Sequence, residues 1–165
     1  ERLVLLNAHG GQIGLLQVAA RQLRLRCPSM GVLPCFIWSG VDGLSSLLPP
    51  EELAHGLHAG QAETSLMLHM APELVGPSRP MDGAHGPRSA LAPPDGWSLE
   101  GAAPCAWLTS DLSQSGVIGD ARLASAELGL ELEQALILHW TQRFKSLLSS
   151  DWPPTKSVVD WPRKS

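Results

Sequence analysis

Two histidines that belong to small, turn-forming stretches are the residues best placed to do chemistry. His9 lies within Asn7-Ala8-His9-Gly10-Gly11, directly after a short apolar run. His58 opens the stretch His58-Ala59-Gly60-Gln61-Ala62-Glu63, and Glu63 lies at the expected start of a helix. An imidazole followed by a carboxylate suits metal binding or acid–base catalysis. The simpler interpretations are a hydrogen-bonding turn histidine and a glutamate that is only a favourable charge in a first helical turn.

A strand, a turn and a helix are expected to position His9. The apolar run Leu3–Leu6 predicts a buried parallel strand, and apolar residues at helical spacing predict a helix over residues 13–25. A second buried strand is expected over residues 31–38, which completes a right-handed βαβ unit. His9 then lies at the carboxyl end of a strand, where open α/β sheets bind ligands. The spacing Gly11-x-x-Gly14 does not fit a dinucleotide-binding turn, so a nucleotide site is excluded.

Two further helices are expected downstream. Pro49–Glu52 reads as a short loop, and a helix is predicted from Glu63 to Met70. A long helix is predicted over residues 121–148, with Asp120 as its N-cap and Gly129 as a point where it breaks or bends. Asp111 is interpreted as another cap, and the remaining histidines, His55, His69, His85 and His139, as structural or exposed residues.

The predicted organisation is one α/β domain over residues 1–150 and a C-terminal arm over residues 151–165, which has no periodicity. Residues 76–101 are rich in proline and glycine and predict an irregular excursion, whose role the sequence leaves open. A chain of 165 residues is long enough to hold a core without disulfides.

Composition excludes several classes of partner and site. The net charge is −4 and basic residues form no long run, so neither nucleic acid nor an anionic membrane surface is an expected partner. The three cysteines form no Cys-x-x-Cys pair, which favours a reducing, cytoplasmic setting. No apolar stretch is long enough to cross a membrane, and the N-terminus lacks the pattern of a signal peptide.

Three motifs in order resemble the creatininase (creatinine amidohydrolase) family. They are Asn7–Gly11, His58–Ser65 with its continuation through Val75, and Gly116–Ala124. The resemblance covers most of residues 3–148, and the middle motif is the most specific. It implies a three-layer α/β/α fold with a mainly parallel sheet and a two-metal hydrolytic centre at the carboxyl ends of the strands.

The resemblance also implies roles for individual residues. His9 is similar to a metal-binding histidine of the family, although Ala8 stands where the family has glycine. His58 matches the catalytic histidine that assists proton transfer. We assign Glu63 to the metal and Asn7, Gly10 and Gly60 to substrate binding. Creatinine hydrolases proper carry a metal-binding glutamate where this chain has Gly11, which argues against creatinine as the substrate.

The implied function is metal-dependent hydrolysis of an amide or cyclic amide C–N bond, of the non-peptide class, by a metal-activated water. The metal is expected to be zinc, with manganese or iron as alternatives, the substrate a small amide, and the assembly a homo-oligomer. The substrate itself is not readable, because relatives also deformylate pyrimidine precursors or cleave peptides during redox-cofactor maturation.

The family's N-terminal metal-binding segment, a Glu-x-His pair followed by an Asp, has no match in this sequence. Because the chain begins at Glu1 and runs straight into a strand, we interpret it as the C-terminal part of a longer protein. Two alternatives stay open: a non-catalytic fragment or interaction subunit with an incomplete metal site, and a purely structural α/β subunit in which His9, His58 and Glu63 lie apart.

Overall fold

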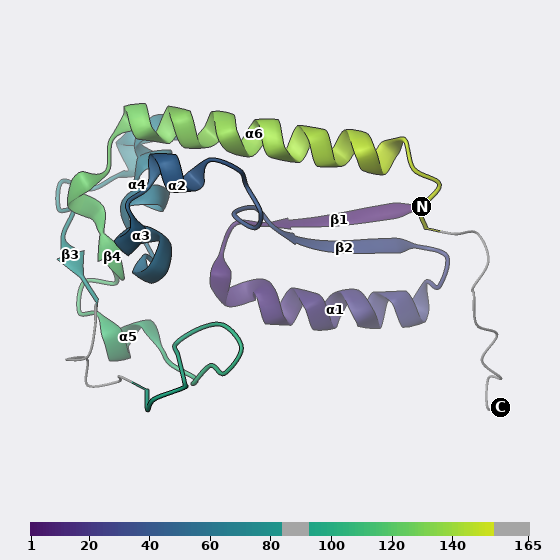
Figure 1. Ribbon diagram of the computed structural model, residues 1–165, viewed down its shortest axis with the longest axis horizontal. Helices are drawn as coiled ribbons and strands as arrows, with labels where there is room; N and C mark the ends of the chain where they lie inside the picture. The colour runs from purple at the N-terminus through teal and green to yellow at the C-terminus, as the bar shows by residue number, and fades with distance from the viewer. Residues whose placement is uncertain (84–92, 154–165) are drawn as a thin grey trace. The chain divides into compact units, whose positions relative to one another are not determined.

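A computed structural model describes residues 1–83 and 93–153 (Figure 1). The chain divides into two compact units. The first, here called the sheet unit, comprises Glu1–Val41 and the chain from Leu136 onward; the second, here called the helical unit, comprises Asp42–Ala135. The single domain predicted over residues 1–150 stays a prediction. His85 lies outside the described residues, as do most of the predicted arm and part of the proline- and glycine-rich stretch.

The sheet unit contains the predicted βαβ arrangement. Strand β1 (Arg2–Asn7) and strand β2 (Gly31–Phe36) pair in parallel, from Arg2 opposite Gly31 to Asn7 opposite Phe36. Helix α1 (Ile13–Arg26) connects them and ends shortly before Pro28, which cannot continue a helix. Strand β2 ends two residues earlier than predicted, where the backbone turns after Phe36.

Helices cover both faces of this sheet, so the sheet unit has three layers (Figure 1). Helix α1 lies on one face, and the second half of helix α6 (Ala126–Leu148) lies on the other. The indole Nε1 of Trp140 on α6 donates to the carbonyl of Ile37 at 2.9 Å, just after β2. At the end of the described chain, the Trp152 ring packs against Gly31, where a Cβ would come within 2.5 Å of the ring.

The helical unit consists of short helices and loops with a two-stranded antiparallel ribbon. Its elements are α2 (Leu44–Leu47), α3 (Pro50–His55), α4 (Gln61–Met70), β3 (Met81–Asp82), α5 (Thr109–Leu112), β4 (Gly119–Asp120) and the first half of α6. Most of the buried apolar side chains of the described chain belong to this unit, including Leu48, Leu112, Ile118 and Leu132.

Three of the predictions for this region are wrong. The expected loop at Pro49–Glu52 is the start of helix α3, because Pro50 occupies the first helical position, where its missing N–H costs nothing. The long helix begins at Ala126 and not at residue 121, because Ala124 is extended. Asp120 therefore caps the short 3₁₀ helix Ala121–Leu123, whereas the Ser125 hydroxyl accepts from the amide of Leu128 and caps α6.

Gly129 does not break α6 as predicted; it permits a close approach between two helices. A Cβ at this position would overlap the carbonyl oxygen of Ser65 and lie 2.7 Å from Cβ of His69, both on α4. Next to this crossing, the Ser65 hydroxyl is fully buried and accepts from the amide of Ser125 at 3.1 Å. The imidazole of His69 contacts the Glu133 carboxylate at 3.2 Å, which fits the structural role expected for it.

One carboxylate organises the loop between α5 and β4. Oδ2 of Asp82 accepts from the hydroxyls of Ser113 and Ser115 at 2.8 and 2.7 Å and from the amides of Gln114 and Ser115 at 3.1 and 2.9 Å. The hydrogen bonds from Ser115, with further ones from Gly83 and Ser113, lower the pKa of Asp82 far below its usual value. No sequence pattern marks Asp82, because its serine partners lie more than thirty residues away along the chain.

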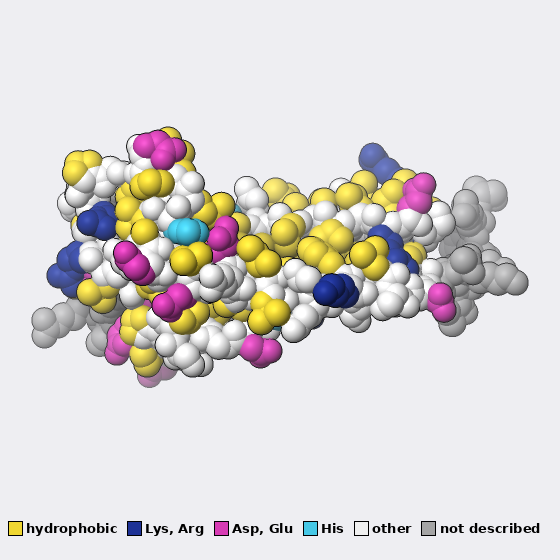
Figure 2. All heavy atoms as spheres, turned by 90° about the horizontal axis from the view of Figure 1, so that it is seen from above, with side chains coloured by type: hydrophobic (Ala, Val, Ile, Leu, Met, Phe, Trp, Pro, Cys, Tyr) yellow, Lys and Arg dark blue, Asp and Glu magenta, His cyan; other side chains and the backbone are white. Residues whose placement is uncertain are grey.

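Large hydrophobic side chains remain exposed on several helices. Figure 2, which looks at the face on which α6 lies, shows hydrophobic side chains among charged and polar ones. On α6, Ile137 and Leu138 are 58% and 61% exposed, and on α1 Leu15 and Leu25 are 70% and 82% exposed. No helix within residues 1–83 and 93–153 is both long and apolar enough to cross a membrane.

The helix crossing at Gly129 predicts that an alanine there destabilises the protein, although alanine has a higher helix propensity than glycine. We expect Gly129→Ala to lower the free energy of unfolding by about 1–3 kcal/mol, because the added methyl group overlaps α4 and the backbone has to shift. As a control, Gly14→Ala on α1 meets nothing within 4 Å and should stabilise by up to about 1 kcal/mol. Urea denaturation of both variants tests this, and equal or opposite effects would contradict it.

The Asp82 loop predicts a pH-dependent effect. The pKa of Asp82 is lower in the folded than in the unfolded state, so its ionised form stabilises the fold above the unfolded value. That contribution is lost as the pH falls from there toward the folded-state pKa. Asp82→Asn should therefore lower the melting temperature at neutral pH, and its difference from the wild type should shrink on acidification. The exposed Asp95→Asn is the control; a difference that does not change with pH would disprove the mechanism.

Candidate functional site

In the sheet unit, Asn7 and His9 form one tight turn at the carboxyl end of β1. Oδ1 of Asn7 accepts from the amide of His9 at 3.1 Å, and Nδ2 of Asn7 donates to the carbonyl of His9 at 2.7 Å. The side chain of Asn7 is almost fully buried, whereas His9 is exposed. Asn7 thus holds the backbone that presents the imidazole, and Gly10 starts the 3₁₀ turn that leads into α1.

Gly11 lies directly beside the His9 ring. A Cβ on Gly11 would come within 3.0 Å of Nε2 of His9. A side chain at this position would therefore press against the ring and force it to shift. Glycine at position 11 leaves room for the imidazole in its present position.

In the helical unit, a backbone bridge joins the motif of His58 to that of Ile118. The amide of His58 donates to the carbonyl of Ile118 at 3.1 Å, and the amide of Ile118 donates to the carbonyl of His58 at 2.7 Å. Ile118 is 1% exposed and anchors the bridge in the core. The second and third sequence motifs are therefore two sides of one structure, and the His58 side chain, at 40% exposure, projects from it.

Ala59 has a left-handed backbone conformation with φ of 49°. An alanine in this conformation costs about 1–2 kcal/mol. Two residues at the start of α4 offset the cost: Oε2 of Glu63 accepts from the amide of Ala59 at 2.6 Å, and the Thr64 hydroxyl donates to its carbonyl at 3.0 Å. A hydrogen bond to a charged acceptor contributes about 1.5–3 kcal/mol, so the conformation is sustained.

The Glu63 carboxylate is engaged first with this turn and only second with the histidine. Its Oε2 lies 3.9 Å from Nδ1 of His58, and both side chains are more than a third exposed. At that separation and exposure the ion pair contributes little, whereas the amide bond at 2.6 Å is short and direct. The structure thus brings His58 and Glu63 together, with Glu63 in the first turn of α4 and its carboxylate bonded to the turn at Ala59. Its assignment as a metal ligand stays a prediction.

Glu52 on α3 is a buried carboxylate that the sequence-based analysis missed. It is 9% exposed, and its Oε1 accepts from the amide of Ala62 at 2.9 Å. Burial raises the pKa of Glu52; the amides of Ala62, Asp120 and Gln61 oppose this rise, and the charge of Glu63 adds to it. Glu51 and Glu52 are adjacent, and nothing in the sequence distinguishes the buried one from the exposed one. The glycines that surround Glu52 come from separate segments and are brought together only by folding.

Three glycines leave room for this carboxylate. A Cβ at Gly60 would come within 2.6 Å of its Oε1, one at Gly56 within 2.5 Å of its Cδ, and one at Gly119 within 3.3 Å of its Oε2. Packing against Glu52 therefore accounts for glycine at position 60. The substrate-binding role assigned to Gly60 stays a prediction, as do those of Asn7 and Gly10.

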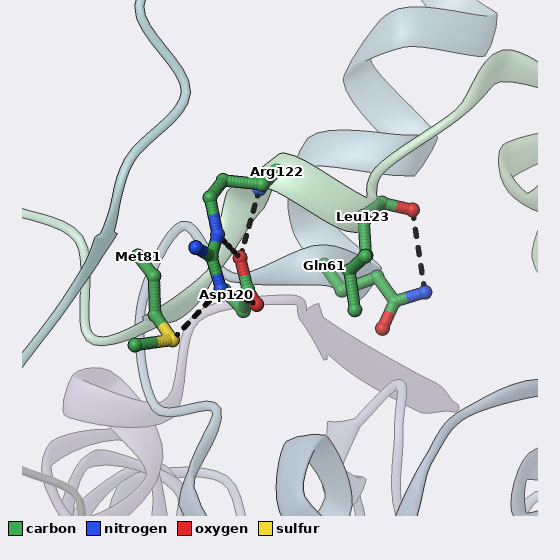
Figure 3. A network of polar contacts seen from close by, with 5 residues as sticks. All are labelled: Gln61, Met81, Asp120, Arg122 and Leu123. Carbon is green, nitrogen blue, oxygen red and sulfur yellow. Dashed lines mark hydrogen bonds and ion pairs between the residues drawn. The ribbon is translucent and has the colours of Figure 1, made fainter.

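Figure 3 shows an ion pair between Arg122 and Asp120, the residue whose amide also hydrogen-bonds to Glu52. The guanidinium of Arg122 contacts the Asp120 carboxylate through Nε and Nη2, both at 2.8 Å, and Nη2 also donates to Sδ of Met81 at 3.1 Å. Nearby, the Gln61 side chain donates to the carbonyl of Leu123 at 3.3 Å. Asp120 thus caps the 3₁₀ helix Ala121–Leu123 and forms an ion pair, and is not the predicted cap of the long helix. Asp111 caps α5 by accepting from the amide of Leu108, as expected.

The predicted site residues fall into two groups, each on its own unit. Asn7, His9 and Gly10 belong to the sheet unit, and His58, Gly60 and Glu63 to the helical unit. Their convergence on one cleft stays a prediction. Within the described part of the chain, no group of three or more histidine, cysteine, aspartate or glutamate side chains is arranged to hold a metal ion.

The sequence matches the creatinine amidohydrolase (creatininase) family over residues 1–144. Curated relatives named mycofactocin precursor peptide peptidase include one from Mycobacterium ulcerans (strain Agy99), 33% identical over 129 residues, which are 78% of this chain and 42% of the relative. Another, from Mycobacterium tuberculosis (strain ATCC 25618 / H37Rv), is 31% identical over 137 residues, 83% of this chain and 45% of the relative. The chain spans less than half the length of these two relatives.

Solved structures show the same fold. A protein from Bacteroides fragilis NCTC 9343, provisionally named a creatinine amidohydrolase, superposes with a TM-score of 0.64 at 20% identity, over 91% of this chain and 55% of its own. A creatinine amidohydrolase (creatininase) superposes with a TM-score of 0.58 at 22% identity, over 90% of this chain and 56% of its own. These likenesses confirm the α/β fold class. With the match over residues 1–144, they lead to one conclusion: the chain belongs to the creatininase family.

Proposed function

We propose that this chain is the part of a creatininase-family amidohydrolase that supplies the catalytic histidine, His58. The observation that carries the proposal is the His58 turn, which is bridged to Ile118, held by α4 and leaves the imidazole accessible. A histidine presented in this way can protonate a leaving nitrogen when an amide C–N bond breaks. Such proton transfer contributes typically 10²- to 10⁴-fold to the rate.

A divalent metal, with zinc as the first choice and manganese or iron as alternatives, belongs to the proposal for the complete enzyme. The described residues do not fit a metal centre by themselves, because a catalytic zinc takes about three protein ligands and no such group lies together here. We propose that His9, an exposed histidine that directly follows the carboxyl end of β1, supplies one ligand. The others then come from outside the described residues, which agrees with the greater length of the relatives.

The proposed substrate carries an amide C–N bond. The name of the mycobacterial relatives makes a peptide amide the first class to test, and small or cyclic non-peptide amides the second. Gly11 in place of the glutamate of creatinine hydrolases argues against creatinine itself. A homo-oligomeric assembly, a cytoplasmic location and the lack of nucleic-acid and membrane partners stay predictions.

The alternative function is an interaction subunit with an incomplete metal site. The observation that favours it is the turn-stabilising use of the Glu63 carboxylate, which leaves the helical unit with one side chain assigned to chemistry. Under this alternative, replacing His58 leaves the activity of the complete protein unchanged.

The proposed roles predict different failures for the two histidines in the complete protein. We expect His9→Ala to lose metal and activity together, because a ligand is removed. His58→Ala should keep the metal and lose turnover by about 10²- to 10⁴-fold, because only the proton donor is missing. Metal analysis alongside turnover measurements is the test, with the exposed His55→Ala as control. Loss of metal from His58→Ala, or full metal content in His9→Ala, would overturn the assignment.

The incomplete ligand set predicts how the 165-residue chain behaves alone. We expect it to be inactive and to bind zinc only weakly, because too few ligands share the charge of the ion. Isothermal titration calorimetry with zinc measures this directly. Tight, stoichiometric binding of two zinc ions would contradict the proposal.

A further inference from the structure

Glu52 connects three separate segments of the helical unit. Its carboxylate accepts hydrogen bonds from the amides of Gln61 and Ala62 at the start of α4 and from that of Asp120 in β4. It also lies against Gly60, the last residue of the turn that begins at His58. The α4 amides and the β4 amide therefore share one acceptor, placed under the turn.

The same three segments determine where the His58 imidazole lies. The backbone of His58 is bridged to Ile118, two residues before Asp120, and Ala59 is held by Glu63 and Thr64 of α4. A shift of α4 relative to β4 would therefore move both supports of His58. The Glu52 carboxylate hydrogen-bonds to amides of both α4 and β4 and so opposes such a shift.

Burying a carboxylate between two segments costs free energy, because the charged group loses its hydration. Stability alone therefore does not explain its presence. Glu52 is 9% exposed and loses most of its hydration, and a Cβ at Gly56 or Gly60 would overlap its carboxylate. An apolar side chain could fill the same space without that cost, but it could not accept several amide hydrogen bonds in fixed directions. The arrangement is therefore suited to precise positioning.

We propose that Glu52 is a positioning residue for the reaction: by holding the first amides of α4 and the amide of β4 together beneath the Gly60 turn, it fixes the His58 imidazole in its working position. The inference rests on the proposed function, in which His58 is the proton donor. Glu52 itself does not contact the substrate. Its effect reaches the reaction through His58.

The test is a kinetic cycle in the complete enzyme with Glu52→Gln, His58→Ala and the double variant. Glutamine keeps the length and one acceptor oxygen but turns an NH₂ group toward amide donors. We expect Glu52→Gln to lower kcat by roughly 10- to 100-fold with little change in KM, because a misplacement of about 1 Å can cost 10²-fold. In the His58→Ala background the same substitution should cause no further loss, because Glu52 acts through His58.

Two additional variants make the test specific. Glu51→Gln on the same helix is the matched control, because Glu51 is exposed, and it should behave as the wild type. Gly56→Ala places a Cβ within 2.5 Å of Cδ and within 2.7 Å of the backbone carbonyl oxygen of Glu52, so it displaces the carboxylate together with the end of α3 without removing the charge. It should reproduce the loss of kcat, and it keeps the test decisive if Glu52→Gln does not fold. Activities are compared well below each variant's melting temperature.

The outcomes separate this inference from the proposed function. A normal kcat in Glu52→Gln, or a loss that adds fully to that of His58→Ala, would overturn the positioning role while leaving His58 as the proton donor. An unchanged turnover in His58→Ala would overturn both. A lower melting temperature with unchanged kcat would show that Glu52 contributes only to stability.

Discussion

The backbone bridge between His58 and Ile118 is the interaction on which the geometry of the helical unit depends. It joins residues sixty positions apart through two reciprocal hydrogen bonds, and the burial of Ile118 keeps water from competing for them. The turn that presents His58 is built on this bridge. Ala59 can be left-handed only because the residues after it are part of α4, whose Glu63 and Thr64 take up its amide and carbonyl.

Close packing between segments is the second constraint, and in each case a glycine permits it because it has no side chain. Gly129 lets α6 cross α4 against the carbonyl of Ser65, and Gly60 and Gly119 leave space for the Glu52 carboxylate. Gly60 and Gly119 lie inside the family motifs, whereas Gly129 follows the third motif. Some motif residues are therefore glycine because of packing and not because of a role in the reaction. The two reasons can be distinguished only by finding which atoms an added side chain would overlap.

The sheet unit shows how little of an α/β domain suffices to place a turn residue. Two parallel strands and two covering helices position Asn7 at the carboxyl end of β1, and the buried amide of Asn7 then shapes the backbone of His9. Few of its apolar side chains are fully buried, and several on α1 remain exposed. Local hydrogen bonds, more than a large core, hold the histidine of this unit in place.

The sequence by itself determined the features that depend on neighbours along the chain. Strand β1, helix α1, strand β2 and helix α4 follow from runs of apolar residues and from glycine and proline, and the family follows from the three motifs. Only the tertiary structure decided the features that depend on distant partners. The role of Glu52 depends on amides nine and more residues away, and the start of α6 depends on Ser125, whose amide is bonded to Ser65. Likewise, the role of Asp82 depends on its hydrogen bonds from Ser113 and Ser115, and that of Gly129 on its contact with the α4 backbone. Such contacts leave no periodic trace in the sequence, because hydrogen bonding and steric exclusion act between atoms that folding alone brings together.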